Sequence, residues 1–291
     1  MGGTRIRHAV LDEKLKGDRE DGIFGKLLEL QTQPTQSADL PSTLESLIAS
    51  ATKRHKIEFI GVSFAGQISD STIVAAPNIA LGALKNADFS QWARSRFCLP
   101  ASIDNDLKCA LRAEAASRGF EGSTFALYIG TGIGGAFMQQ SALLRGDRNL
   151  AGEIGHIPFE KTPFLCGCGG SDCLESSASG SGIAKWSEFY GLKERALSEL
   201  NASNDPKAKE IVSRFYRGVD HAVKTIVALF NPSEIVLGGG IAMSEKEVLP
   251  RAQRAARDAF KPAACAKVEL SALGDCANLL GASLLDRAHS I

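Results

Sequence analysis

Short apolar runs alternate with amphipathic stretches in both halves of the chain. The apolar runs predict β-strands, which occupy residues 6–11, 27–32, 57–63, 125–129 and 235–237. Apolar residues at helical spacing predict helices between and after them: residues 44–51 behind Ser42 as N-cap, residues 107–116 directly after Asn105-Asp106, and a last helix near 279–288. Strands that alternate with helices predict α/β layers in each half, with a boundary near residues 105–125.

The longest predicted helix lies between two prolines. Asp205-Pro206 provides an N-cap and a proline for the first turn, and Asn231-Pro232 ends the pattern. Apolar residues recur on one face between these two points. The buried strand at 235–237 then leads into Gly238-Gly239-Gly240.

A second glycine cluster follows the strand at 125–129. Residues 130–135 read Gly-Thr-Gly-Ile-Gly-Gly and match the dinucleotide-binding pattern G-x-G-x-x-G, with Glu153 near the place of its acidic residue. That pattern must open a helix, whereas Ala136-Phe137-Met138 continues as a strand. We therefore predict a hairpin whose backbone N–H groups bind phosphate, the alternative being a hairpin that is merely tight. The chain has no G-x-x-x-x-G-K-[ST] motif, which argues against a Walker-type NTPase.

Histidine and cysteine residues gather in the next segment with the spacing H-x9-C-x-C-x4-C. Thiolates and imidazole in a tetrahedron suit zinc, and the glycines between the cysteines let the chain curl around one ion. We predict a structural zinc site without an open position for catalysis; the alternative is three unrelated buried thiols. The four predicted ligands are His156, Cys166, Cys168 and Cys173.

The composition narrows the classes of function. Lys plus Arg balance Asp plus Glu at 33 each, and 44% of the 291 residues are apolar, as in an ordinary globular protein. Apolar runs stay well short of the roughly 18 residues that span a bilayer. The seven cysteines are an odd number, which argues against a disulfide framework. We therefore predict a cytoplasmic protein that binds neither nucleic acid nor membranes.

Residues 151–156 (Ala-Gly-Glu-Ile-Gly-His) and 166–175 (Cys-Gly-Cys-Gly-Gly-Ser-Asp-Cys-Leu-Glu) closely resemble the signature of the ROK family of sugar kinases, a branch of the actin and hexokinase superfamily. Other motifs follow in family order: Gly2-Gly3-Thr4-Arg5, Asn105-Asp106, the 130–135 hairpin and the strand and turn at 234–240. The resemblance implies a two-domain α/β fold, actin-like (ribonuclease H-like), with a cleft between the domains. The expected small domain is 1–118, the large domain with the zinc motif is 119–277, and a helix at about 278–291 packs back on the small domain.

The resemblance also implies that the chain phosphorylates a hexose or N-acetylhexosamine with ATP and Mg²⁺, as a homodimer. Asp106 would be the general base, and His156 would use one ring nitrogen for zinc and the other for sugar. The implied sugar-binding residues are Gly66, Gln67, Asn78, Asn105, Asp106, Glu153, His156 and Glu175. The implied ATP-binding residues are Gly3, Thr4, Gly130, Thr131, Gly132, Gly239 and Gly240.

Several of these residues have a plainer explanation. Asp106 can be an N-cap, Glu153 and Glu175 can be surface carboxylates, and Asn78 after Pro77 can initiate a turn. The competing functions are a sugar-binding protein without turnover and, with less support, a sugar-responsive repressor. The Glu-x-x-His spacing favours glucose or an N-acetylhexosamine over fructose and allose.

The sequence departs from the family pattern in three places. Ala65 stands where proline is common before Gly66, and Lys108 where a small polar residue is commoner. The strand and aspartate expected before Gly2-Gly3-Thr4 are missing. That aspartate helps to manage magnesium in the family. We therefore expect the chain as written to be a poor kinase, and an upstream extension to restore its activity.

Overall fold

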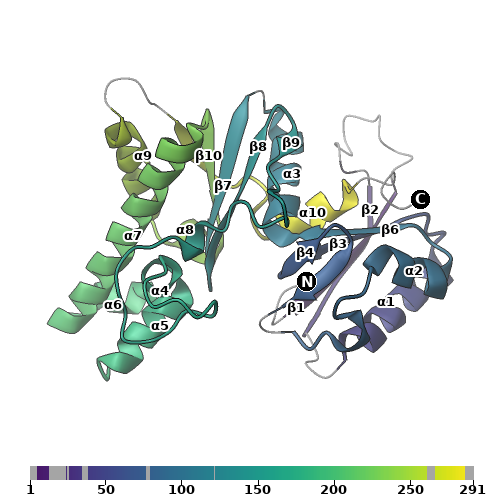
Figure 1. Ribbon diagram of the computed structural model, residues 1–291, viewed down its shortest axis with the longest axis horizontal. Helices are drawn as coiled ribbons and strands as arrows, with labels where there is room; N and C mark the ends of the chain where they lie inside the picture. The colour runs from purple at the N-terminus through teal and green to yellow at the C-terminus, as the bar shows by residue number, and fades with distance from the viewer. Residues whose placement is uncertain are drawn as a thin grey trace. The chain divides into compact units, whose positions relative to one another are not determined.

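Helices and strands alternate along the chain and fall into two units (Figure 1). The computed structural model describes residues 5–12, 24, 26–34, 39–76, 79–120, 122–260 and 266–285. Unit 1 consists of Met1–Gly119, Arg145–Leu150 and Cys276–Ile291, and unit 2 of Phe120–Leu144 and Ala151–Asp275. Unit 1 is thus assembled from separate stretches of the sequence. Within the described residues, every helix is too short or too polar to span a lipid bilayer.

The strands of unit 1 pair two by two in the described part of the chain. β1 (Arg5–Asp12) is antiparallel to β2 (Lys26–Pro34), and β4 (Gln67–Ser69) is antiparallel to β5 (Thr72–Ala75). β3 (Ile60–Phe64) lies parallel to β6 (Ala101–Asn105), so their carboxyl ends meet with Phe64 opposite Asn105. The strand predicted at 57–63 is β3, which begins three residues later, at Ile60, where the pairing with β6 starts.

Helices of unit 1 bury their apolar sides against these strands. Side chains of β1, β3, β6, α1 (Leu40–Arg54) and α2 (Phe89–Phe97) share one core, in which Phe64 and Phe89 are fully buried. The N-cap predicted for α1 was wrong. Asp39 caps the helix, and its carboxylate accepts hydrogen bonds from the backbone N–H and the hydroxyl of Ser42. Pro41 explains the shift, because a proline belongs in the first turn.

The last described helix, α10 (Ala277–Ser283), packs against α3 (Asp106–Arg118). α10 ends at Ser283, earlier than predicted, because bonds from Leu284 N–H to Gly281 O (3.1 Å) and Leu285 N–H to Ala282 O (3.3 Å) tighten the last turn. Residues 286–288 of the predicted helix lie outside the described residues. A Cβ on Gly281 would overlap the backbone carbonyl of Cys109 in α3. Glycine is therefore required for the two helices to approach this closely.

Substituting Gly281 by alanine is expected to destabilise unit 1 by roughly 1–3 kcal/mol, because the backbone of α3 must move to admit one methyl group. The two tryptophans allow the units to be followed separately: Trp92 lies in α2 and Trp186 in unit 2. In a Trp186→Phe background, the thermal midpoint of Trp92 fluorescence should fall. Ser283→Ala in the same helix is the control, and equal midpoints for all three proteins would contradict the prediction.

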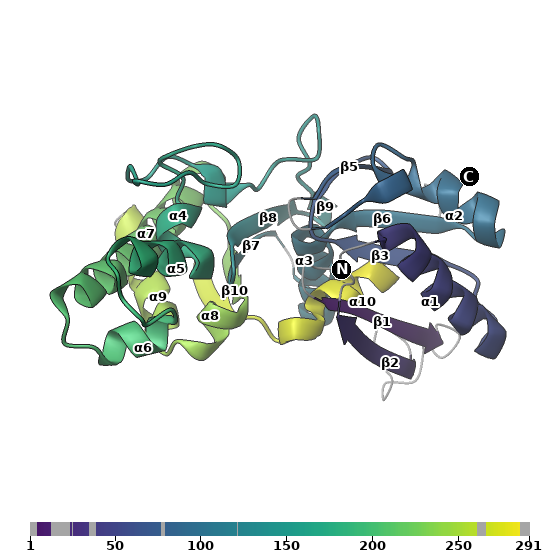
Figure 2. The ribbon, with the colours of Figure 1, turned by 90° about the horizontal axis from the view of Figure 1, so that it is seen from below.

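Unit 2 is built on one five-stranded sheet in the order β11-β10-β7-β8-β9. β7 (Ser123–Ile129), β10 (Glu234–Gly238) and β11 (Lys267–Leu270) are parallel, whereas β8 (Ile133–Gln139) and β9 (Ala142–Leu143) are antiparallel additions. Figure 2 shows its helices gathered on one side of this sheet. These helices are α4 (Glu175–Ala178), α5 (Gly180–Phe189), α6 (Leu197–Ala202), α7 (Pro206–Phe230), α8 (Gly240–Ser244) and α9 (Val248–Ala259).

The predictions for the longest helix are confirmed. Asp205 accepts from Lys207 N–H at 2.7 Å as N-cap of α7, and Pro206 is its first residue. The helix ends at Asn231, which adopts the left-handed conformation with φ 39°. Its apolar face packs on Phe125, Leu127 and Ile129 of β7, which point to the same side of the sheet.

Candidate functional site

The glycine cluster at 130–135 forms a tight hairpin between β7 and β8. Ile129 pairs with Ile133, and Gly130 N–H donates to Gly132 O at 2.9 Å inside the loop. The predicted hairpin is confirmed, and the dinucleotide-binding interpretation fails because no helix opens at these glycines.

The glycine cluster at 238–240 lies beside this hairpin. Because β10 and β7 are parallel neighbours, with Gly238 opposite Tyr128, their carboxyl ends meet at one edge of the sheet. Gly239 has φ +88°, and a Cβ there would lie 2.5 Å from the carbonyl oxygen of Ile129. A Cβ on Gly130 would lie 3.6 Å from the backbone nitrogen of Gly240. The structure therefore brings together two of the predicted ATP-binding segments.

A third segment meets the hairpin, and sequence reasoning missed it. Gly180 N–H donates to Gly130 O at 2.8 Å and Ser181 N–H to Thr131 O at 2.9 Å, at the start of α5. Ser179 caps that helix by accepting from Gly182 N–H at 3.1 Å. The signal for this contact was the run of small residues at 176–182, which allows the two backbones to approach closely.

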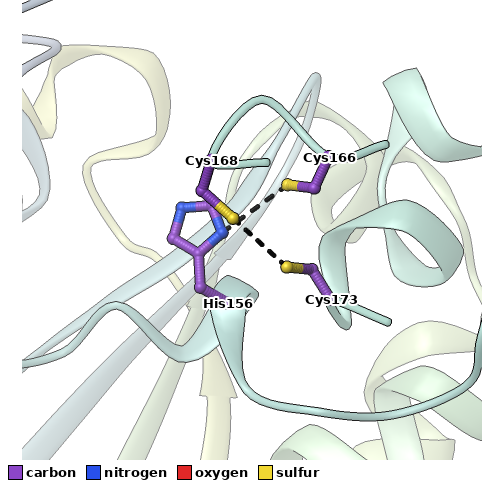
Figure 3. Close-up of side chains that lie close together, drawn as sticks. All are labelled: His156, Cys166, Cys168 and Cys173. Atoms are coloured by element: carbon purple, nitrogen blue, oxygen red, sulfur yellow. Dashed lines mark hydrogen bonds between the residues drawn. The ribbon is translucent and has the colours of Figure 1, made fainter. Parts of the chain in front are cut away.

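The predicted zinc ligands converge on one point (Figure 3). The short 3-10 helix η3 (Ile154–His156) presents the histidine, and a glycine-rich loop presents the thiols. All four ligand atoms lie within 4.8 Å of one another. Cys168 Sγ is 3.4 Å from Cys173 Sγ, and Cys166 Sγ is 3.6 Å from His156 Nδ1.

These distances fit a tetrahedral zinc site. With Zn–S of about 2.3 Å and Zn–N of about 2.0–2.1 Å, the edges of the tetrahedron measure about 3.8 Å between sulfurs and about 3.6 Å between sulfur and nitrogen. Burial, together with the neighbouring thiols, raises the pKa of Cys173 to about 12, whereas the backbone N–H of Gly170 lowers the pKa of Cys168. A bound cation would stabilise the three cysteines as thiolates in this position.

The ligand loop, residues 157–174, is bonded to the rest of unit 2. Phe159 N–H donates to Asp172 O at 2.8 Å and Leu174 N–H to Ile157 O at 3.0 Å, which ties the two ends of the loop together. Glu160 bridges to α7 through ion pairs with Arg214 and Arg217, and the Arg214 guanidinium stacks 4.2 Å from the ring centre of Trp186. The ligands are therefore held in place by protein contacts as well.

Glu175 joins the cysteine cluster to the glycine hairpin. Its Oε2 accepts from Ile133 N–H at 3.1 Å, and its Oε1 is 3.7 Å from Cys166 Sγ. The surface-carboxylate alternative is therefore wrong for Glu175, which is half-buried. Glu153 is exposed, and its carbonyl accepts from His156 N–H at 3.1 Å.

Unit 1 holds the other predicted sugar-binding residues. The N-cap of α3 is Asn105, whose Oδ1 accepts from Leu107 N–H (3.0 Å) and Lys108 N–H (3.3 Å). The N-cap alternative for Asp106 is therefore wrong: Asp106 is the first residue of the helix, half-buried, with Oδ1 3.0 Å from Leu107 N.

Gly66 lies beside Asn105, as the parallel pairing of β3 and β6 requires. Asn105 Nδ2 donates to Gly66 O at 3.4 Å. Gln67 begins β4 with an exposed side chain. The predicted residues Gly3, Thr4 and Asn78 lie outside the described residues.

Comparisons with known proteins cover nearly the whole chain. The model of the ROK family matches residues 1–289. The chain is 28% identical to the N-acetyl-D-glucosamine kinase of Vibrio vulnificus and 29% identical to an N-acetylmannosamine kinase of Yersinia pseudotuberculosis, over 98% and 99% of this chain and 97% of each relative. A ROK family glucokinase from Streptomyces griseus, solved in complex with glucose and AMPPNP, matches with a TM-score of 0.76 and 25% identity, covering 99% of this chain and 97% of that chain.

Proposed function

Because the chain belongs to the ROK family and has the two-domain, actin-like (ribonuclease H-like) ATPase fold, we propose that Asp106 is the general base of its reaction. The protein is an ATP-dependent kinase that phosphorylates a hydroxyl of a hexose or an N-acetylhexosamine. The observation that carries the Asp106 proposal is the capping of α3 by Asn105. Because Asn105 is the N-cap, the Asp106 carboxylate is not required for that role.

In this proposal Asp106 accepts the proton of the sugar hydroxyl as its oxygen bonds to the γ-phosphorus of ATP. The bond from that phosphorus to the bridging oxygen breaks, and ADP leaves. Mg²⁺, when bound with ATP, neutralises charge on the transferring group. Phosphoryl transfer requires positioned groups more than covalent help, which suits a single carboxylate beside a fixed amide.

We also propose which residues hold the two substrates. Amide and carboxylate groups suit a polyol, because several hydroxyl groups need partners in fixed directions. Backbone N–H groups of the glycine segments suit phosphates. The sugar set is Gly66, Gln67, Asn78, Asn105, Asp106, Glu153, His156 and Glu175, and the ATP set is Gly3, Thr4, Gly130, Thr131, Gly132, Gly239 and Gly240.

The metal in this proposal is a structural zinc held by His156, Cys166, Cys168 and Cys173. When bound, zinc supplies charge for the thiolates and fixes the His156 ring, so that Nε2 can serve the sugar. The separation of the ligand atoms supports it. We also propose that the protein is a homodimer, which light scattering on the purified protein tests.

The substrate is tested by measuring ADP formation with glucose, N-acetylglucosamine, N-acetylmannosamine, fructose and allose. We expect glucose or one N-acetylhexosamine to exceed fructose and allose in kcat/KM by about 10-fold or more, because a site that hydrogen-bonds particular hydroxyls rejects sugars that leave its polar groups unpaired. Calorimetric binding of a sugar without any ADP formation would instead identify a sugar-binding protein without turnover.

A further inference from the structure

A buried carboxylate lies immediately before the proposed catalytic pair. Asp104 is the fourth residue of β6 and is 2% exposed. Its Oδ1 accepts from the backbone N–H of Asn105 at 2.8 Å. A buried anion is costly unless it is paired and hydrogen-bonded. The partners of Asp104 therefore fix the position of the carboxyl end of β6.

The partners come from residues 145–150, a stretch that follows β9 in sequence but belongs to unit 1. Arg145 forms two parallel bonds to Asp104, from its terminal nitrogens to Oδ1 (3.0 Å) and Oδ2 (2.6 Å). Asn149 Nδ2 adds a contact to Asp104 Oδ1 at 3.3 Å and another to Ile68 O at 3.0 Å. Such a bidentate pair fixes geometry as well as charge.

The charges agree with this geometry. Burial acts to raise the pKa of Asp104, but the bonds and the charge of Arg145, with the bonds from Asn105 and Asn149, hold it below its ordinary value. The carboxylate in turn raises the pKa of Arg145. Asp104 is thus ionised at neutral pH in spite of its burial.

A second tie starts from α3 itself. Lys108, 2% exposed, donates from Nζ to the backbone carbonyl of Asn149 at 2.8 Å. Arg145 also donates to Asn149 Oδ1 at 3.0 Å. The residues on either side of Asn105-Asp106 are therefore both bonded to the same short stretch of chain, 41 to 45 positions away in sequence.

We propose that Arg145 and Asn149 are positioning residues for the kinase reaction: through Asp104 and Lys108 they fix the turn from β6 into α3 and so aim Asp106 at the sugar hydroxyl. This inference rests on the proposed role of Asp106. In this role neither residue touches the reacting atoms. They act on the backbone at Asn105, whose N–H and side chain are both held in the described structure.

The test is Arg145→Ala, with kcat and KM measured separately for sugar and ATP. We expect kcat to fall about 100-fold, because a small misplacement of a catalytic group has this effect, with KM for ATP within about threefold of wild type. Millimolar guanidinium should restore part of kcat, since Arg145 is 43% exposed at its side chain and the vacated place beside Asp104 is open to solvent on one side. A folding defect alone would not respond to guanidinium in this way.

Arg148→Ala is the matched control: the same residue type in the same stretch, 83% exposed, which should keep kcat within about twofold of wild type. If Arg145→Ala does not fold, as judged by Trp92 fluorescence, Arg145→Lys replaces it. Lysine keeps the charge but not the two parallel bonds, so kcat should still fall about 10-fold.

Asp106→Asn, assayed beside these variants, separates the two ideas. Wild-type kcat in Arg145→Ala and in Arg145→Lys, with Asp106→Asn inactive, would overturn the positioning role alone. Turnover in Asp106→Asn would overturn the base. In that case, hydrogen exchange at the Asn105 N–H tests the positioning role independently. Faster exchange in Arg145→Ala than in wild type supports it, and unchanged exchange contradicts it.

Discussion

Asp106→Asn is expected to lower kcat by about 10²–10⁴-fold while leaving sugar affinity nearly unchanged. The variant keeps the size and shape of the side chain and removes only its ability to accept a proton from the sugar hydroxyl. Stability should change little, because Asn105 and not Asp106 caps α3. Losing one negative charge in the first turn costs about 0.3–1 kcal/mol at most. The measurements are ADP formation for kcat and calorimetric titration for sugar affinity.

A matched control exists in the same unit. Asp88 caps α2, accepting from Ser90 N–H at 2.8 Å and Gln91 N–H at 3.1 Å. Asp88→Asn makes the same chemical change at another helix start and should leave kcat as it is. Near-wild-type turnover in Asp106→Asn would mean that another group takes the proton, and the assignment of the base would have to be abandoned.

Removing the zinc is expected to have the second large effect. Purified protein should contain about one zinc per chain, and stripping it should weaken sugar binding about 10–100-fold, because His156 loses the ligand bond that orients its ring. Trp186 provides the local readout: its ring packs against Phe164 of the ligand loop, and its Nε1 donates to Ser176 O at 3.0 Å. In a Trp92→Phe background its fluorescence should change on chelation and recover when zinc is restored.

Cys173→Ser should reproduce the metal-free state, because it removes one of four ligands from a closed site. Cys276→Ser is the control, an exposed cysteine of unit 1 that lies outside the cluster. Protein with fully reduced thiols and no bound zinc by elemental analysis would show that the cluster is a set of neighbouring thiols and no metal site.

Local signals in the sequence were sufficient for much of the fold. Asp205-Pro206 and Asn231-Pro232 mark both ends of α7, because capping and proline geometry act within one turn. The hairpin at 130–132 was predictable for the same reason: an apolar strand continues on the other side of the glycines. The prediction of an N-cap failed where two suitable residues stood close together, as with Asp39 and Ser42. The side-chain oxygen of either residue could cap the helix, and the position of Pro41 decided between them.

The parts of the candidate site that could be predicted are those in which residue types and their spacing indicate the chemistry. The predicted zinc ligands and the glycine segments were identifiable from spacing, and the structure brings each of these sets together. The bonds of Arg145 and Asn149 to Asp104 leave no trace in periodicity, because they join polar residues more than 40 positions apart. Likewise, the bond from Ile133 N–H to Glu175 depends on tertiary packing alone.

The discontinuous make-up of unit 1 has a consequence for biosynthesis. Its helix α10 is translated after every residue of unit 2, although it packs on α3, and residues 145–150 come from the middle of the chain. On the ribosome, α3 and the strands of unit 1 before it emerge long before α10, so unit 1 cannot complete its packing until α10 has been made. The surface of α3 that Gly281 covers has no helix packed on it during that interval. Fragments cut at residue 119 are therefore unsuitable for expressing unit 1 alone.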